Sequence, residues 1–259
     1  MRIIIPTKGR VKSQTTFTNL PVSLQANTIV VCPKAEVSRL RQNYMYINVM
    51  EQPDPEMGIA EKRKWIVEMS QDENIVMLDD DLRFCVRRED DPGLFRSAVP
   101  SDITKAFAEL GGILSPDVPH AGFAARGGSI GDSAKKGGWQ ISGKRMMYVL
   151  GYHLPTVKEH VIFGRLGTHE DIDICLQLLT KGYPNAVNFS FLVDQKFGNP
   201  GGCSDERTVE KNNADCLKLT EFFPEYVKAK QKDYAGSTPR IEVVCQWQKA
   251  LDDGFLNRE

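Results

Sequence analysis

The sequence predicts an α/β fold with a mostly parallel central sheet flanked by helices. Strand-like segments at 2–5, 28–32 and 46–50 occur with a helical segment at 34–43, and this alternation is typical of a parallel sheet. The apolar run at 75–78 is too short for a helix and too apolar for a surface loop. We therefore expect it to form a buried central strand.

The composition is ordinary for a globular protein. The chain has 259 residues and a formal net charge of -1, so any contact with nucleic acid must come from a local basic patch. We find no long apolar segment and no signal peptide, which predicts a cytoplasmic protein without a membrane partner. The six cysteines form no Cys-x-x-Cys pair, so we expect reduced thiols. Without repeats or a clear linker, we expect a single domain over 1–259, with its oligomeric state left open.

Three consecutive acids, Asp79, Asp80 and Asp81, directly follow the predicted central strand. In open α/β sheets, ligands bind at the carboxyl ends of the strands. Crowded carboxylates repel one another unless a cation neutralises them, and oxygen ligands suit Mg²⁺ or Mn²⁺, which would in turn hold a substrate phosphate. A solvated acidic turn is the alternative, but the apolar strand before the acids favours a metal site.

Two basic segments are candidates for binding a nucleotide. The loop Pro6-Thr7-Lys8-Gly9-Arg10 leaves the first strand, where it is well placed to meet a phosphate. A predicted helix at 58–70 carries Lys62 and Arg63, and Arg63 shares the side of the apolar residues. The loop could instead be a solvated turn, and the helix cations could extend along apolar surface to water.

The middle of the chain contains a glycine-rich stretch at 126–145. We expect an irregular segment at 83–88, a helix at 101–110 and a strand at 120–125 before it, and a strand at 146–153 after it. Glycine at such density predicts a mobile loop without regular elements.

This loop is basic and carries a single tryptophan. It could close over a nucleotide sugar, or follow a nucleic-acid backbone while the tryptophan stacks on a base. A surface insertion is the alternative. The candidate acceptor-binding residues are Trp139, Lys135, Lys136 and Arg126.

An amphipathic helix is predicted to begin near Glu170 and Asp171. Thr168 could cap this helix together with Asp171, which would explain the acids without any chemistry. Alternatively, Glu170 or Asp171 faces the crevice as a general base, because a helix amino terminus keeps a carboxylate ionised.

The carboxyl-terminal part is predicted to begin with a strand at 186–193 and a glycine and proline loop at 198–202. A helix from 209, a strand at 241–245 and a short final helix complete it. A lysine-rich helix end is expected at Lys228, Lys230 and Lys232.

These motifs, in this order, resemble the GT-A fold of nucleotide-diphospho-sugar transferases, whose acidic run is the DxD motif. The opening Ile-Pro-Thr-Lys-Gly-Arg-Val, then Gly-Ile-Ala-Glu-Lys-Arg at 58–63 and Met-Leu-Asp-Asp-Asp at 77–81, are similar to the bacteriophage TET-associated glycosyltransferases. Enzymes of that family glycosylate 5-hydroxymethylcytosine in phage DNA.

The resemblance implies a role for each matching residue. Asp81 would be the principal metal ligand with Asp79 near the ribose or metal, and Asp171 would be the catalytic base. Lys8, Arg10 and Arg63 would face the nucleotide. GT-A enzymes often add a late histidine to the metal, but no histidine follows His169, so Asp194 or a water would replace it.

The chemistry of these residues independently suits sugar transfer. A divalent cation, Mn²⁺ or Mg²⁺, stabilises the departing nucleoside diphosphate, and a base takes the proton of the attacking alcohol. We therefore expect a metal-dependent glycosyltransferase, a hexosyltransferase, that uses a UDP-sugar and modified DNA. If Asp171 is the base, the anomeric centre is inverted.

Several alternatives stay open. They are a glycosyltransferase with another acceptor, a sugar nucleotidyltransferase, a metal-dependent nuclease and a non-catalytic DNA-binding or sugar-binding module. The single glycine in the first loop disfavours the nucleotidyltransferase.

Overall fold

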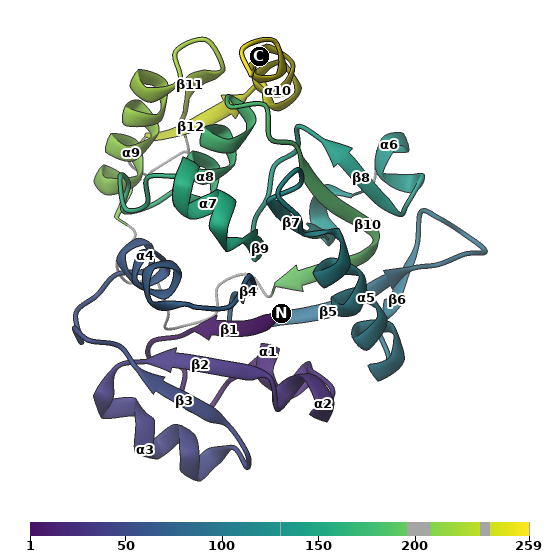
Figure 1. The fold of residues 1–259 in the computed structure, drawn as a ribbon, viewed down its shortest axis with the longest axis vertical. Coiled ribbons are helices and arrows are strands. Elements are labelled where there is room, and N and C mark those ends of the chain that lie inside the picture. The colour runs from purple at the N-terminus through teal and green to yellow at the C-terminus, as the bar shows by residue number, and fades with distance from the viewer. Residues whose placement is uncertain (130, 196–207, 234–238, 259) are drawn as a thin grey trace.

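The computed structural model describes residues 1–129, 131–195, 208–233 and 239–258, and it has one large sheet with helices packed against it (Figure 1). Within this described part the sheet has 10 strands in the order β3-β2-β1-β4-β9-β7-β10-β5-β6, with β8 paired to β10. The strands are β1 Arg2–Pro6, β2 Thr28–Cys32, β3 Asn48–Glu51, β4 Asn74–Leu78, β5 Leu82–Arg87, β6 Phe95–Ser97, β7 His120–Ala125, β8 Trp139–Ser142, β9 Val149–His153 and β10 Asn185–Gln195.

Helices flank the large sheet, and a second, two-stranded sheet lies near the carboxyl terminus. The helices are α1 Thr15–Asn19, α2 Val22–Gln25, α3 Lys34–Asn43, α4 Ile59–Met69, α5 Pro100–Ile113, α6 Asp132–Lys135, α7 Leu154–His160, α8 Glu170–Leu179, α9 Val209–Phe222 and α10 Trp247–Leu256, with a short 3-10 helix η1 at Arg126–Gly128. The small sheet pairs β11 Val227–Lys232 with β12 Arg240–Cys245. In Figure 1, α9, β11, β12 and α10 group at the end of the molecule opposite α3 and β3.

The sheet is mixed, and its amino-terminal half is parallel. Strands β3, β2, β1 and β4 pair in parallel, whereas β9 is antiparallel to both β4 and β7. The carboxyl ends of β1 and β4 therefore meet at one edge. The predicted α/β class with a large central sheet is confirmed.

Alternation along the central strands builds two cores, one on each face of the sheet. Ile75 and Met77 of β4 pack in one cluster with α4 and α8, and Val76 and Leu78 pack in the other cluster with α5. All four side chains are fully buried. Because both faces are covered, β4 reads as a continuous apolar run rather than an alternating one.

Left-handed residues shift the limits of two predicted strands. Tyr46 has a φ of 63°, and β3 begins only at Asn48. Tyr148 has a φ of 67°, and β9 begins at Val149 rather than at Met146. The strands predicted at 2–5, 28–32, 75–78 and 120–125, and the helices at 34–43 and 58–70, are confirmed within one residue at each end.

The segment 83–88, predicted to be irregular, lies largely in β5, which pairs antiparallel with β10. Its arginines do not break the strand, because Arg87 is buried and donates to the carbonyls of Phe189 and Ser129, both at 2.9 Å. The prediction was wrong because pairing with a distant strand outweighed the local charge.

The prediction of a loop without regular elements at 126–145 was also wrong. The stretch contains η1, α6 and β8, and β8 pairs with Asn185–Asn188 of β10. Gly137 and Gly138 have φ values of 66° and 65°, so here glycine supplies the turn that leads into a strand.

The lysine-rich segment predicted as a helix end is β11. Val227 is buried, and Lys228, Lys230 and Lys232 occupy every second position after it along the strand. This period of two was present in the sequence and is typical of a strand.

Other expectations fall partly outside the described residues. The loop at 198–202 and the polar run at 204–207 lie there, and so does Cys203. The other five cysteines are free thiols. Among the described helices, none is long and apolar enough to cross a membrane.

Candidate active site

The loop after β1 and the acids after β4 lie side by side at the edge where these parallel strands end. Thr7 donates its hydroxyl hydrogen to Asp80, and Arg10 forms ion pairs with Asp80 and Asp81, the latter at 2.8 Å. Gln14 donates to Thr7 Oγ1 at 2.9 Å. The structure therefore brings together the basic loop, predicted to meet a phosphate, and the acids, predicted to hold a metal.

The acids are mostly buried and repel one another. Burial raises the pKa of Asp79 to about 6, and the Coulombic attraction of Arg63 only partly offsets it. Burial also raises the pKa of Asp80, against hydrogen bonds from Thr7 and Arg10. For Arg10, burial lowers the pKa, but Asp80 and Asp81 raise it further, so the guanidinium stays charged. The cations that neutralise the acids here belong to the protein.

Both cations of α4 face inward. Lys62 and Arg63 are 2% and 6% exposed, which excludes the interpretation that they reach along apolar surface to water. Lys62 Nζ donates to the carbonyl oxygen of Thr7 at 2.7 Å, which ties α4 to the loop after β1. Arg63 forms ion pairs with Asp79, at 2.7 Å, and with Glu170. One guanidinium therefore joins the acids after β4 to the start of α8.

The rest of the first loop surrounds this network. Pro6 is buried at the end of β1, and Gly9 has a φ of 78° while its N–H donates to Glu36 Oε1 at 2.8 Å. Lys8 lies 4.0 Å from the exposed Glu56, and its own side chain is 31% exposed. Lys8 is thus more accessible than Arg10, Lys62 or Arg63.

Glu170 and Asp171 differ although they are neighbours. Glu170 is 4% exposed and paired with Arg63, whereas Asp171 is partly exposed and its carboxylate accepts from the backbone N–H of Ile172 at 2.9 Å. The structure shows no ion pair between Asp171 and any described residue. This arrangement fixes Glu170 in the ion-pair network and leaves the Asp171 carboxylate partly exposed.

Thr168 is not the helix cap that the sequence suggested. The residue before α8 is His169, in a left-handed conformation with a φ of 60° and without a side-chain capping bond. Such a backbone costs roughly 1–2 kcal/mol in a non-glycine residue. Strain of this kind persists only where surrounding contacts hold it.

Residues of α9, which the sequence reasoning missed, supply those contacts. Asp215 Oδ2 accepts from the backbone N–H of Gly167 at 3.1 Å, and from the N–H and hydroxyl of Thr168 at 2.7 and 3.0 Å. Asn212 Oδ1 lies 3.0 Å from His169 Nε2. These residues are more than 40 positions from their partners, and no local motif could have revealed them.

Two further contacts of the acids were also missed. Gln195, at the end of β10, donates to Asp81 Oδ1 at 2.5 Å. Tyr148, with its left-handed backbone, accepts the N–H of Asp79 at 3.0 Å through its carbonyl oxygen. A non-glycine residue in this conformation beside a cluster of acids is typical of a functional site.

The predicted acceptor-binding residues are only partly brought to the acids. Arg126 lies near them, because it forms an ion pair with Asp194 at 3.0 Å, next to Gln195. Asp194, considered above as a metal ligand, is thus engaged by an arginine. Trp139 pairs with Asn188 of β10, which an irregularity in that strand before Leu192 separates from Gln195.

The remaining contacts of this region are local. Trp139 Nε1 donates to Glu109 at 3.0 Å and its ring packs against Phe123. Lys135 lies 3.5 Å from Asp132, and Lys136 is exposed. None of these three predicted residues lies in the network around Asp79–Asp81.

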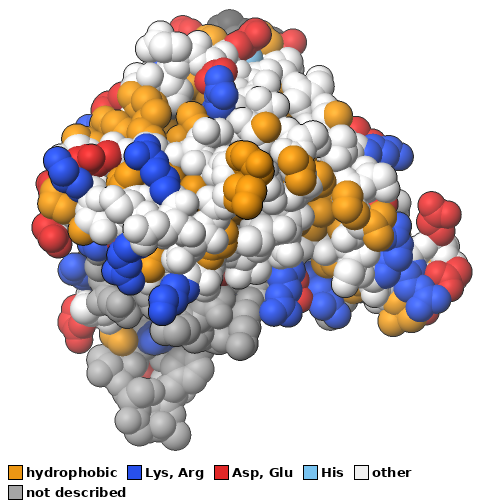
Figure 2. Space-filling view, turned by 90° about the horizontal axis from the view of Figure 1, so that it is seen from below, with side chains coloured by type: hydrophobic (Ala, Val, Ile, Leu, Met, Phe, Trp, Pro, Cys, Tyr) orange, Lys and Arg blue, Asp and Glu red, His pale blue; other side chains and the backbone are white. Residues whose placement is uncertain are grey.

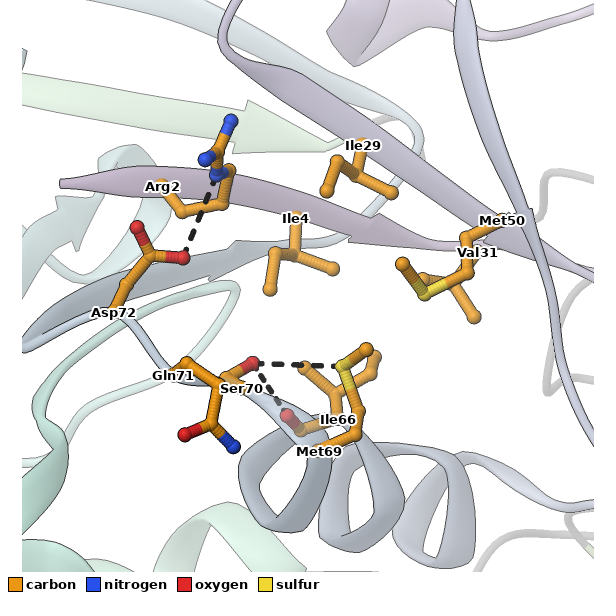
Figure 3. Close-up of a pocket in the computed structure, with 10 residues that line it drawn as sticks. All are labelled: Arg2, Ile4, Ile29, Val31, Met50, Ile66, Met69, Ser70, Gln71 and Asp72. Atoms are coloured by element: carbon orange, nitrogen blue, oxygen red, sulfur yellow. Dashed lines mark hydrogen bonds and ion pairs between the residues drawn. The ribbon is translucent and has the colours of Figure 1, made fainter.

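A pocket of about 220 Å³ lies elsewhere, between α4 and the face of β1, β2 and β3. Figure 3 shows Ile4, Ile29 and Ile66 around it, with the Arg2–Asp72 ion pair at one side. Arg2 is the first residue of β1, whereas the acids lie beyond the last residue of the parallel strand β4. This side of the pocket is therefore at the opposite ends of the strands from the acids. The pocket is therefore separate from the candidate active site.

The acids suit a hard divalent cation by their chemistry. Mg²⁺ commonly uses one or two protein carboxylates and completes its shell with water and substrate phosphates. Asp79 and Asp81 could supply those two carboxylates. Among the described residues, no group of three or more His, Cys, Asp or Glu side chains forms a ready metal cluster.

The fold is that of the GT-A-like glycosyltransferases. TarS 1–349 from S. aureus shares the fold with a TM-score of 0.51 and 14% identity, over 100% of this chain and 71% of that chain. Glucosyl-3-phosphoglycerate synthase from Mycobacterium tuberculosis, in complex with Mn²⁺, UDP and phosphoglyceric acid, matches with a TM-score of 0.53 and 11% identity, over 94% and 86% of the two chains.

Sequence comparison identifies the family. The model of the TET-associated glycosyltransferases matches residues 1–202, and the chain belongs to this family of enzymes. It is 26% identical over 242 residues to the beta-glucosyl-HMC-alpha-glucosyl-transferase of Enterobacteria phage T6, covering 89% of this chain and 84% of that protein. The enzyme of the same name from phage T2 is 29% identical over 187 residues, with 69% and 65% covered.

Proposed function

We propose that this glycosyltransferase moves a sugar from a UDP-sugar to the hydroxyl group of 5-hydroxymethylcytosine in phage DNA, with the help of Mn²⁺ or Mg²⁺. The observation that carries the proposal is the meeting of the acids after β4 with the start of α8 through Arg63. This brings the carboxylates suited to a metal and a candidate base into one site of a TET-associated glycosyltransferase. A DNA acceptor of this kind would place the enzyme in the host cytoplasm.

The acids after β4 would hold the donor. Asp81 and Asp79 would bind the cation, which when bound stabilises the negative charge of the departing diphosphate. The Mn²⁺ and UDP held by the mycobacterial relative support this assignment. Lys8 is more accessible than the other three basic residues of the site, which are Arg10, Lys62 and Arg63, and it would contact the nucleotide. Pro6, Thr7, Asp80, Arg10 and Lys62 would shape the nucleotide site, since most of their contacts lie within the network.

Asp171 would act as the base. It is partly exposed and has no ion-pair partner among the described residues, whereas its neighbour Glu170 is held by Arg63. A base positioned for the hydroxyl proton accelerates transfer by about 10²–10⁴-fold. Direct attack assisted in this way inverts the anomeric centre, so the configuration of the product tests the assignment. Retention would give Asp171 a different role.

A second acceptor is favoured by the names of the relatives. Both phage enzymes are described as acting on beta-glucosyl-HMC, an already glucosylated base. The alternative function is therefore the addition of a sugar to glucosylated 5-hydroxymethylcytosine.

Intact-mass measurement on three matched DNA duplexes tests the proposed acceptor and the alternative acceptor. The duplexes carry cytosine, 5-hydroxymethylcytosine or its β-glucosylated form, and each is incubated with the enzyme, Mn²⁺ and a panel of UDP-sugars. We expect a gain of one sugar mass on the second duplex, abolished by EDTA and by Asp81→Ala. A gain on the third duplex alone would establish the alternative acceptor. No gain on any modified duplex, despite binding of a UDP-sugar, would refute DNA as the acceptor.

A further inference from the structure

The small sheet formed by β11 and β12 presents a row of cations. In this antiparallel hairpin, Lys228, Lys230 and Lys232 lie opposite Val244, Glu242 and Arg240. Opposed residues of a pair share a face, and alternate residues point the same way. The three lysines and Arg240 therefore project from one face of the hairpin. The other face carries the buried Val227 and lies against α9.

This face is strongly and accessibly basic. Lys228, Lys230, Lys232 and Arg240 are all exposed. Glu242 is the one acid among the six residues of this face, and it forms an ion pair with Lys232 at 2.5 Å. Within the described part of the chain, neither Lys228 nor Lys230 has an ion pair with a carboxylate. A net positive row is thus left facing solvent.

The spacing of the row matches a nucleic-acid strand. Alternate residues of a strand lie about 6.8 Å apart. One strand of DNA advances about 3.4 Å per nucleotide along its axis. Neighbouring phosphates of one strand are farther apart than this rise, because the backbone winds around the axis. The spacing of successive lysines is therefore close to that of neighbouring phosphates, so the row can follow a single phosphate backbone.

The hairpin is also connected to the candidate active site. Asn212 donates to the carbonyl oxygen of Ile241 at 3.1 Å, and its Oδ1 lies 3.0 Å from His169, which precedes Glu170. Ile241 follows Arg240, so α9 ties this part of the hairpin to the turn before α8.

Other surfaces show less uniform charge. On the face in Figure 2, the blue Lys and Arg side chains are interspersed with red Asp and Glu side chains. In the 126–145 region, Arg126 and Lys135 each have a carboxylate partner. The hairpin also lies outside residues 1–202, the part of the chain that the family model matches.

From this geometry we infer that the outer face of the β11–β12 hairpin binds the phosphate backbone of the acceptor DNA. The inference rests on the proposed function, because it takes the acceptor to be DNA. The contact is electrostatic and independent of sequence.

The test is DNA binding by the double variant Lys228→Gln, Lys230→Gln, measured by fluorescence anisotropy of a labelled duplex at several salt concentrations. Each phosphate contact contributes about one unit to the slope of log affinity against log salt. We expect the slope to fall by about two and affinity to fall about tenfold at low salt. The matched control is Lys34→Gln, Lys105→Gln, which removes two lysines that are 82% and 80% exposed elsewhere.

The conservative variant Lys228→Arg, Lys230→Arg should bind as the wild type does, which separates charge from folding. Equal losses in the hairpin and control variants, or a wild-type protein that does not bind DNA, would overturn the inference. If DNA binding depends on the hairpin but no duplex gains sugar, the proposed function fails, and only the binding of a DNA backbone by the hairpin is supported.

Discussion

Arg63 of α4 and Glu170 of α8 form a buried ion pair, although 107 positions separate them in the chain. The same guanidinium also contacts Asp79 at 2.7 Å. Burial by itself lowers the pKa of Arg63, but Glu170 and Asp79 raise it above its ordinary value. Arg63 therefore stays charged and fixes the distance between the acids after β4 and the start of α8.

Replacing Arg63 should damage both stability and transfer. Arg63→Gln leaves the buried Glu170 carboxylate without this partner, which typically costs about 3–5 kcal/mol. We expect urea unfolding to show such a loss, and Arg63→Lys to recover part of the stability but little activity, because an ammonium lacks the planar fork that spans two acids. In the double variant with Glu170→Gln the loss should be smaller than the sum. Additive losses would contradict coupling between the two residues.

Asp171→Asn should separate binding from chemistry. Because Asp171 is partly exposed and has no ion pair among the described residues, we expect its unfolding free energy to change by less than about 0.5 kcal/mol. The kcat should fall by at least about 10²-fold, and the dissociation constant of the UDP-sugar should not change. Single-turnover kinetics and calorimetry measure these quantities. An unchanged kcat would show that Asp171 is not the base.

Asp215 should matter for turnover, although it acts through the turn before α8. Asp215→Ala leaves the N–H groups of Gly167 and Thr168 without their acceptor, which costs about 1–3 kcal/mol. We expect kcat to fall while KM for the UDP-sugar stays constant, since the nucleotide residues lie elsewhere. Lys218→Gln is the matched control, because Lys218 is exposed and lies 3.9 Å from Asp215. A loss of stability with normal kcat would reduce Asp215 to a structural role.

Buried His120 should make the protein less stable in mild acid. Burial lowers its pKa from 6.5 to about 4, while the hydrogen bond to Gly151 opposes this change. Between these two values the unfolded chain binds a proton that the native state does not. The free energy of unfolding therefore falls as pH decreases below 6.5, by at most about 1.4 kcal/mol per pH unit. Above pH 6.5 both states are neutral and His120 contributes no slope.

Urea unfolding between pH 7.5 and 4.5 measures this dependence. His120→Phe keeps a ring against Tyr152, which stacks on His120 at 4.8 Å, but removes the titration. The slope of the variant should be shallower than that of the wild type over this range. Parallel slopes would show that His120 is protonated in the native state.

Local patterns predicted much of the fold and the inner part of the site. The apolar run before Asp79 predicted β4, and the rule that ligands bind at the carboxyl ends of strands placed the acids beside the loop after β1. Arg63 was predicted to share the apolar side of its helix, and from that side of α4 it contacts Asp79. These inferences succeed because strand and helix periodicity determine which way a side chain points.

The predictions that were wrong share a different cause. β5 and β8 are strands because β10 pairs with both of them. This pairing outweighed two local signals for irregular structure, the arginines in β5 and the glycines before β8. Trp139, predicted to touch the acceptor, is held beside Asn188 by the same pairing, and none of its interactions described above is with the acids. Only the lysines of β11 carried an overlooked local signal, their period of two.

The sequence by itself determined the class of the fold, the family and the types of residue that could perform sugar transfer. The tertiary structure decided which of those residues are engaged by buried partners and which are partly exposed. Glu170 and Asp171 are adjacent acids that no local pattern separates, yet Arg63 engages Glu170 and leaves Asp171 partly exposed. Asp215 reaches the turn before them from α9. Contacts between distant segments decide which of these side chains are engaged. Such contacts depend on how the helices pack rather than on the residues nearby in the chain.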